Sequence, residues 1–148
     1  MLVDDSIKRI LSETRILVHP KTFTLVSIDR KEEERARLLL QDLEAFSSVT
    51  FDHAEVSLVV RSDRWTELRG GFRDFEEKGP YRLITFDIVL DLSIVGFIAV
   101  VSARLAEAGV SIYALSTFLK DHILVKSRDA EKAIDVLRGL VDECGGEA

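Results

Sequence analysis

The sequence predicts an α+β protein built from two ferredoxin-like (βαββαβ) modules in tandem, with antiparallel strands and helices on one face. Two observations lead to this prediction. Short apolar runs rich in β-branched residues alternate along the chain with stretches whose apolar residues recur at helical spacing. Each half also follows the order strand, helix, strand, strand and then a helix or helical turn, which is most of a βαββαβ unit. We expect an N-terminal module over residues 1–79 and a C-terminal module over residues 80–148.

The elements of the first half follow one another in a simple order. After a short amphipathic start, the strand candidates RILVH and TFTLVSI lie on either side of a turn at His19-Pro20-Lys21. A helix is expected in DRKEEERARLLLQDLEAF, where Asp29 and Glu32 have the spacing of a capping box. The strands SSVTFD and EVSLVVR and a helical turn, SDRWTELRG, come next, before a glycine-containing loop that ends at Gly79-Pro80.

The second half repeats this order. YRLITFDIVLD predicts a strand, Ser93–Ala108 a helix, and VSIYALSTF and HILVK two further strands. The segment SRDAEKAIDVLRGLVDEC predicts a closing amphipathic helix. Because RILVH is surplus to the strands of its own half, we expect it to cross over and complete the sheet of the second half.

Composition and charge argue against several classes of protein. With 148 residues, of which 47% are hydrophobic and 31% charged, the chain has the balance of a globular protein. Its net charge of -6 disfavours a large surface for nucleic acid or for an anionic membrane. The longest apolar run, residues 93–101, is far shorter than a membrane crossing of roughly 20 residues. The N-terminus is acidic where a secretory signal is basic, so we expect a cytoplasmic protein.

The sequence contains no recognisable catalytic or metal-binding motif. A single cysteine, Cys144, cannot form an intramolecular disulfide, and the histidines lack the short spacings of metal ligands. The patterns GxSxG, GxGxxG, HExxH and the Walker A loop are absent. We therefore predict a protein that is not an enzyme and has no cofactor or metal. The stretch RGGFRDF is superficially similar to an RNA-binding motif, but its position before two glutamates and Gly79-Pro80 favours a packed loop or edge strand.

The start of the helix expected at Ser93 leads to the main functional hypothesis. With Ser93 as N-cap, the backbone N–H groups of Ile94, Val95 and Gly96 lack partners within the helix and suit a carboxylate. Gly96 then gives a ligand access to the backbone; the alternative is that this glycine lets the helix lie close to the sheet. Asp91, two residues before the cap, is placed to accept a hydrogen bond from an ammonium group. A free amino acid presents both groups.

The segment LSTFLKD supplies a second candidate wall for the same site. Ser116 and Thr117 offer hydroxyl groups, Phe118 an apolar face and Asp121 a carboxylate. The alternative is that the serine and threonine only form a turn and that Asp121 is an exposed hairpin residue. Two separated acids, Asp91 and Asp121, favour an amino acid with a cationic side chain.

These motifs resemble the ACT-domain family of small-molecule-binding regulatory modules. The likeness lies in Gly96 early in a helix, in LAEAGVSI, and in YALSTF followed by Asp121 and Leu124-Val125. It is nearest to the tandem two-module type, which includes the cytosolic arginine sensors and short bacterial and archaeal relatives. Two departures from the family pattern are His122, where a Tyr or Phe is usual, and Leu119-Lys120 in place of a small polar pair.

The resemblance implies a sensor or regulatory protein that binds a free amino acid and is not an enzyme. Ligand binding would favour one arrangement of modules or subunits by its differential affinity. The resemblance also implies a homodimer and a regulated enzyme or complex as partner, with no nucleic acid and no membrane. The alternative, from a different class, is a ligand-free protein–protein interaction module that uses its sheet edges or helix faces.

Overall fold

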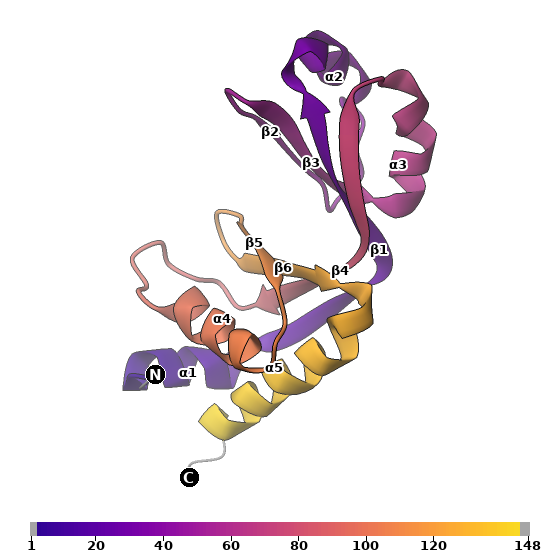
Figure 1. The fold of residues 1–148 in the computed structure, drawn as a ribbon. Helices are drawn as coiled ribbons and strands as arrows, with labels where there is room; N and C mark the ends of the chain where they lie inside the picture. Colours follow the sequence, from indigo (N-terminus) through magenta and orange to yellow (C-terminus); the bar gives the residue numbers. More distant parts are fainter. Residues whose placement is uncertain (1–2, 146–148) are drawn as a thin grey trace. The chain divides into compact units, whose positions relative to one another are not determined.

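The computed structural model describes residues 3–145 and has the α+β architecture that the sequence predicts. Its helices are α1 (Asp5–Glu13), α2 (Glu33–Leu39), α3 (Ser62–Leu68), α4 (Phe97–Glu107) and α5 (Ala130–Gly145). Its strands are β1 (Arg15–Asp29), β2 (Ser48–Phe51), β3 (Glu55–Arg61), β4 (Phe75–Asp87), β5 (Ile112–Ser116) and β6 (Asp121–Lys126). They form one six-stranded sheet in the order β2-β3-β1-β4-β6-β5 (Figure 1). Among the described residues, no helix is long and apolar enough to cross a membrane.

The described chain divides into two compact units, one of residues 3–20 with 82–145 and one of Lys21–Tyr81. The long strands β1 and β4 each contribute one half to either unit. The first unit therefore has the strand order β1-β4-β6-β5 and the second β2-β3-β1-β4, which gives two ferredoxin-like modules. RILVH joins the second half of the chain, as expected. The boundary between residues 79 and 80 stays a prediction.

Two breaks expected in the strands are wrong. β1 runs without interruption through His19-Pro20-Lys21, and β4 runs through Gly79-Pro80. Proline has a fixed φ that suits extended backbone, so it need not end a strand. A Cβ added at Gly79 would lie 3.1 Å from the carbonyl oxygen of Phe23. The close backbone of the neighbouring strand β1 therefore accounts for this glycine.

The core of the unit that contains residues 82–145 lies between its strands and three helices. Figure 1 shows α1, α4 and α5 on one side of these strands. Alternate strand residues point into this core, as the pleat requires, among them Ile84, Phe86, Ile123 and Val125. The rings of Phe86 and Phe97 meet edge to face with their centroids 5.5 Å apart. This contact fixes the first turn of α4 against the sheet.

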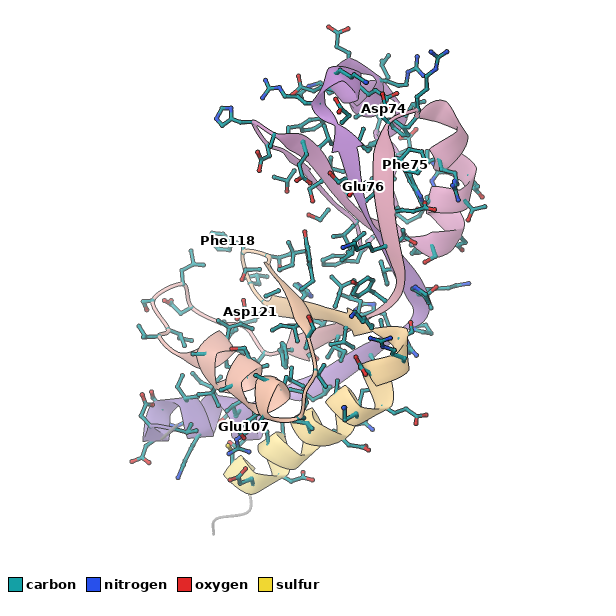
Figure 2. The ribbon with its side chains drawn as sticks, viewed as in Figure 1. Asp74, Phe75, Glu76, Glu107, Phe118 and Asp121 are labelled. Carbon is teal, nitrogen blue, oxygen red and sulfur yellow. The ribbon has the colours of Figure 1, made fainter. Side chains whose placement is uncertain are left out.

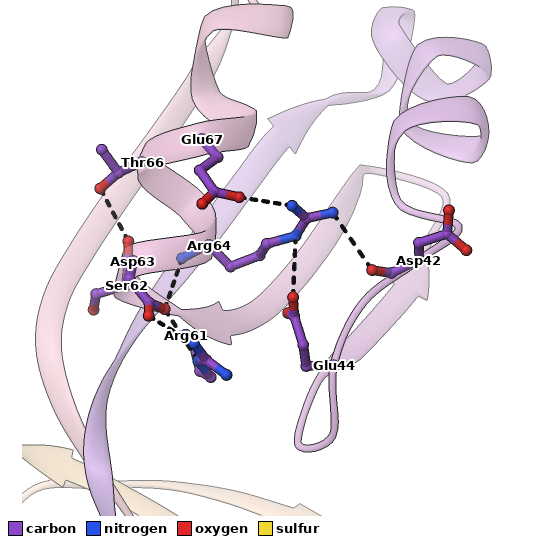
Figure 3. Close-up of polar contacts among 8 residues, drawn as sticks. All are labelled: Asp42, Glu44, Arg61, Ser62, Asp63, Arg64, Thr66 and Glu67. Atoms are coloured by element: carbon purple, nitrogen blue, oxygen red, sulfur yellow. Dashed lines mark hydrogen bonds and ion pairs between the residues drawn. The ribbon is translucent and has the colours of Figure 1, made fainter.

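The core of the unit Lys21–Tyr81 is built around Trp65. Its ring is buried and contacts Phe72 and Phe75, with centroids 5.9 Å and 5.1 Å away. The aromatic residues of RGGFRDF thus pack inside the unit, as expected for a packed loop or edge strand. Arg64 on α3 holds the loop before β2, because it donates to the carbonyl oxygen of Asp42 at 3.4 Å and lies 3.5 Å from the carboxylate of Glu44 (Figure 3).

The capping box expected from Asp29 and Glu32 is only half correct. Asp29 accepts a hydrogen bond from the N–H of Lys31 at 2.9 Å and so caps a short 3-10 turn, Arg30–Glu32. The carboxylate of Glu32 instead accepts from the backbone N–H groups of Arg73 and Asp74. A side chain that could have closed the helix start locally is therefore used to hold a distant loop.

Candidate functional site

The helix start that the sequence places at Ser93 lies further along the chain. α4 begins at Phe97, and its N-cap is Gly96, which has no side chain to cap the helix. The backbone N–H and the hydroxyl of Ser93 both donate to Oδ1 of Asp91, at 2.8 Å and 2.5 Å. The prediction of Ser93 as N-cap is wrong because this local turn takes its hydrogen bonds. Ile94 and Val95 precede the helix and are not part of its first turn.

Gly96 has a backbone conformation that favours glycine. Its φ is 97° and its ψ 0°, in the left-handed region that other residues rarely adopt. A Cβ added there would have no heavy atom within 4 Å. Close packing of the helix on the sheet is therefore not the reason for this glycine.

The start of α4 leaves backbone donors that the helix itself does not use. Within the helix, Val100 is the first residue to donate, to the carbonyl oxygen of Gly96 at 3.1 Å. The N–H groups of Phe97, Ile98 and Ala99 precede this bond and carry the partial positive charge of a helix N-terminus. Donors suited to an anion are thus present, three residues later than predicted.

The hairpin between β5 and β6 forms the facing wall. Ser116 and Asp121 lie opposite each other in the antiparallel pair, and the Ser116 hydroxyl donates to Oδ1 of Asp121 at 2.6 Å. The N–H and the hydroxyl of Thr117 both donate to the carbonyl oxygen of Lys120, at 2.9 Å and 3.1 Å, which closes the turn. Figure 2 shows Phe118 at the tip of this hairpin, where its side chain is 77% exposed.

The loop before α4 and the hairpin enclose a cavity of about 200 Å³. Of the predicted site residues, its lining includes Asp91, Ile94, Gly96, Ser116, Thr117, Phe118 and Asp121, whereas Ser93 and Val95 are not among the lining residues. The sequence did not assign a further set to the site: Leu90, Leu92, Phe97, Ile98, Leu119 and Lys120. A backbone bond explains part of this set, because the N–H of Leu90 donates to the carbonyl oxygen of Leu119 at 2.8 Å. Nothing in the sequence pattern indicates that bond.

The charged groups of the cavity are unevenly paired. Lys120 donates to Asp87 at 2.7 Å, and Arg15 lies 3.3 Å from the same carboxylate. The hydrogen bond from Lys120 holds the pKa of Asp87 below its usual value. The pKa of Asp91 is lowered too, by the hydrogen bond from the Ser93 hydroxyl. Among the ion pairs of the described residues, none involves Asp91 or Asp121, so the lining carries two acids without a cationic partner.

A buried histidine lies beside the hairpin. His122 is 6% exposed, and its ring nitrogens lie 2.8 Å from Oγ1 of Thr85 and 3.0 Å from Oγ1 of Thr117. Oγ1 of Thr85 is also 2.9 Å from Nε2 of His19. Burial lowers the pKa of both histidines. These distant residues meet because β1, β4 and β6 are neighbours in the sheet. In the described chain, no group of three or more His, Cys, Asp or Glu residues could hold a metal ion.

Residues 78–139 of the chain match the ACT domain family. This segment covers most of the region in which the sequence motifs resemble that family. The relation to the tandem type and to the arginine sensors stays a prediction. No curated protein matches the chain.

Several solved structures share the fold. One is a protein of unknown function from Vibrio cholerae, described as a possible transport protein, with a TM-score of 0.72 and 18% identity over 93% of this chain and 97% of that one. Another is a protein from Agrobacterium tumefaciens, with a TM-score of 0.70 and 24% identity over 86% and 89%. A third is the regulatory subunit of aspartate kinase from Thermus flavus, with a TM-score of 0.65 and 9% identity over 84% and 95%. At these identities the likeness shows the fold alone.

Proposed function

We propose that this protein is a regulatory or sensor protein that binds a free amino acid in the cavity between α4 and the β5–β6 hairpin. The observation that carries the proposal is the meeting of two complementary features in one lining. The uncapped start of α4 offers backbone donors, and Asp91 and Asp121 offer carboxylates without cationic partners. An amino acid has a carboxylate for the first and an ammonium group for the second.

The contacts that such a ligand would make follow from the geometry. Its carboxylate accepts from the N–H groups at the start of α4, where the helix dipole favours negative charge. Its ammonium group donates to Oδ2 of Asp91, because Oδ1 already accepts hydrogen bonds from Ser93. The volume of about 200 Å³ is below the roughly 300–1,000 Å³ that is usual for drug-sized ligands, so a small metabolite is the appropriate size class.

The remaining charge of the lining favours a cationic side chain on the ligand. Lys120 is neutralised by Asp87, so it does not balance the acids of the cavity. Once one of Asp91 and Asp121 binds the ammonium group, the other stays available. A basic amino acid therefore has a second partner, whereas an acidic one meets repulsion.

The comparisons support a regulatory role. The ACT domain match falls on the half of the chain that contains the cavity. A solved structure with this fold is a regulatory subunit of aspartate kinase, so this fold can act as a regulator of an enzyme. A ligand that bridges α4 and the hairpin can favour one arrangement of modules or subunits by its differential affinity. We accordingly propose a cytoplasmic homodimer that acts on an enzyme or complex and is not itself catalytic.

A second candidate function is supported by the apolar rim of the cavity. Leu92, Val95 and Phe118 are 74%, 83% and 77% exposed, which is unusual for large apolar side chains grouped on two adjacent loops. A ligand-free protein–protein interaction module would use such a surface. It differs from the leading proposal in requiring no small molecule.

A panel of amino acids tests which function holds. Thermal unfolding at pH 7.5 in millimolar amounts of each proteinogenic amino acid should show a higher Tm with one or a few ligands, the basic ones first. Asp91→Asn keeps the oxygen that accepts from Ser93 but removes the charge, so it should abolish the shift. Asp135→Asn, an exposed acid on α5 of the same unit, is the matched control and should keep it. A flat response of the unaltered protein across the panel refutes amino-acid binding and favours the interaction module.

A further inference from the structure

Lys120 is the only cationic side chain among the described residues that line the cavity. Its ammonium group donates to Oδ1 of Asp87 at 2.7 Å, and Asp87 is not among the lining residues. The lysine belongs to the pair Leu119-Lys120, which stands where the ACT-domain pattern has small polar residues. A positive charge has thus entered the wall of the site, and the structure pairs it with a carboxylate outside the lining.

Asp87, the last residue of β4, lies between two cations. Besides Lys120, the side chain of Arg15 approaches it, with Nε 3.3 Å from Oδ2. Arg15 begins β1 and Lys120 directly precedes β6, so the three groups meet because β1, β4 and β6 are neighbours in the sheet. The side chains of Asp87 and Lys120 are only 26% and 31% exposed. Their attraction is therefore screened less than that of a fully exposed ion pair.

Without the charge of Asp87, the two cations around it would repel each other. Lysine has a long, flexible stem, so the ammonium group of Lys120 can move to another partner. The acids of its own wall are Asp91 and Asp121, which line the same cavity and take part in none of the ion pairs between described residues. A released Lys120 would neutralise part of their charge, and it would repel the cationic side chain of a basic ligand.

On the basis of the function proposed above, we propose that Asp87 is a positioning residue that sets the charge preference of the ligand site. It holds the ammonium group of Lys120 away from Asp91 and Asp121, so that both acids stay available to a basic amino acid. Because Asp87 does not line the cavity, it acts on the ligand through Lys120. The alternative is that this ion pair only fastens the hairpin to β4, without any effect on which ligand binds.

Two pairs of ligands with closely similar shapes measure the charge preference: L-lysine with L-norleucine, and L-arginine with L-citrulline. Isothermal titration calorimetry at pH 7.5 gives, for each pair, the ratio of the Kd of the neutral ligand to the Kd of the basic one. Asp87→Asn should lower this ratio on the order of tenfold, the effect of one partly screened charge. A displaced hairpin weakens both members of a pair alike and leaves the ratio unchanged, and that result would refute the proposal.

Removal of Lys120 tests whether the effect of Asp87 passes through it. The double variant Asp87→Asn/Lys120→Met has no cation to release, so its ratio should return to within about twofold of that of the unaltered protein. Asp87→Glu keeps the carboxylate and should also keep the ratio. Arg15→Gln is the matched control and should keep it too, because it removes the other cation from the same carboxylate and Arg15 does not line the cavity. A double variant that behaves like Asp87→Asn overturns the proposal.

Carboxylate NMR of the ligand-free protein tests the ion pair itself. The hydrogen bond from Lys120 is the main cause that lowers the pKa of Asp87, and the charge of Arg15 contributes less. The pKa of Asp87 should therefore rise more in Lys120→Met than in Arg15→Gln, and no rise in Lys120→Met would show that Asp87 does not hold this lysine.

The outcomes for this role and for the proposed function can be told apart. If the unaltered protein binds neither lysine nor arginine, the preference for a basic amino acid is refuted, and the role of Asp87 is refuted with it. If it binds a basic ligand and Asp87→Asn leaves the ratio unchanged, only the role of Asp87 is refuted.

Discussion

Replacement of Gly96 by alanine should destabilise the protein although there is space for the added methyl group. The Cβ would have no heavy atom within 4 Å, so steric overlap contributes nothing to the cost. The backbone, however, has a φ of 97°. An L residue in the left-handed region costs about 1–2 kcal/mol, and alanine recovers less than this by restricting the unfolded chain.

A second glycine provides a control of opposite sign. Gly139 lies within α5, is exposed, and a Cβ added there would also meet no atom within 4 Å. Its conformation is helical, so Gly139→Ala should stabilise the protein by about 0.5–1 kcal/mol. The two glycine-to-alanine changes are alike in chemistry and in available space and differ in backbone conformation. Their free energies of unfolding should therefore differ by about 2 kcal/mol.

Urea unfolding followed by circular dichroism measures both changes, and thermal unfolding gives an independent check. For a chain of this length, 2 kcal/mol corresponds to a Tm difference of roughly 4–8 °C. Gly96→Asn adds a further test, because asparagine tolerates the left-handed region better than alanine does. If strain decides the outcome, the larger asparagine destabilises less than alanine. If alanine is neutral at position 96, or better tolerated than asparagine, the backbone explanation of Gly96 is wrong.

Two further predictions concern pH and association. The folded-state pKa of His19 and of His122 is lowered from 6.5, so the unfolded chain binds more protons than the folded one in the window below 6.5. The free energy of unfolding should therefore decrease as pH falls from about 6.5 towards the lowered pKa values of the folded state. Urea unfolding at pH 5–8 measures this decrease, and His122→Gln should make it smaller. Greater stability at the acidic end of this range would contradict the prediction. Val95→Ser and Phe118→Ser should weaken self-association in sedimentation velocity, because they remove exposed apolar surface from the cavity rim. Leu38→Ser, at a residue 71% exposed on α2, is the control, and an equal effect of Leu38→Ser would show that the rim is not the interface.

Much of the fold could be predicted because the periodic signals are local. The alternation in EVSLVVR became β3, and the apolar stripe of the last segment became α5. Even the crossover of RILVH followed from a count of elements. The uninterrupted passage of β1 through Pro20, and of β4 through Gly79-Pro80, could not be predicted in this way. Proline and glycine mark turns on average, but here neighbouring strands keep the backbone extended.

The candidate site, like the fold, could be predicted from the sequence only in part. The sequence alone determined which segments carry groups that could bind an amino acid, because side-chain type and order along the chain are sufficient for that. Asp91–Gly96 supplies a carboxylate and a flexible backbone, and Ser116–Asp121 supplies hydroxyl groups and a second acid. Only the tertiary structure decided which atoms are available. The hydrogen bonds from Ser93 to Asp91 moved the helix start to Phe97, and the adjacency of β1, β4 and β6 brought His19 and His122 onto one threonine. Both results depend on contacts that compete across the fold, and residue order does not record which contact is the more favourable.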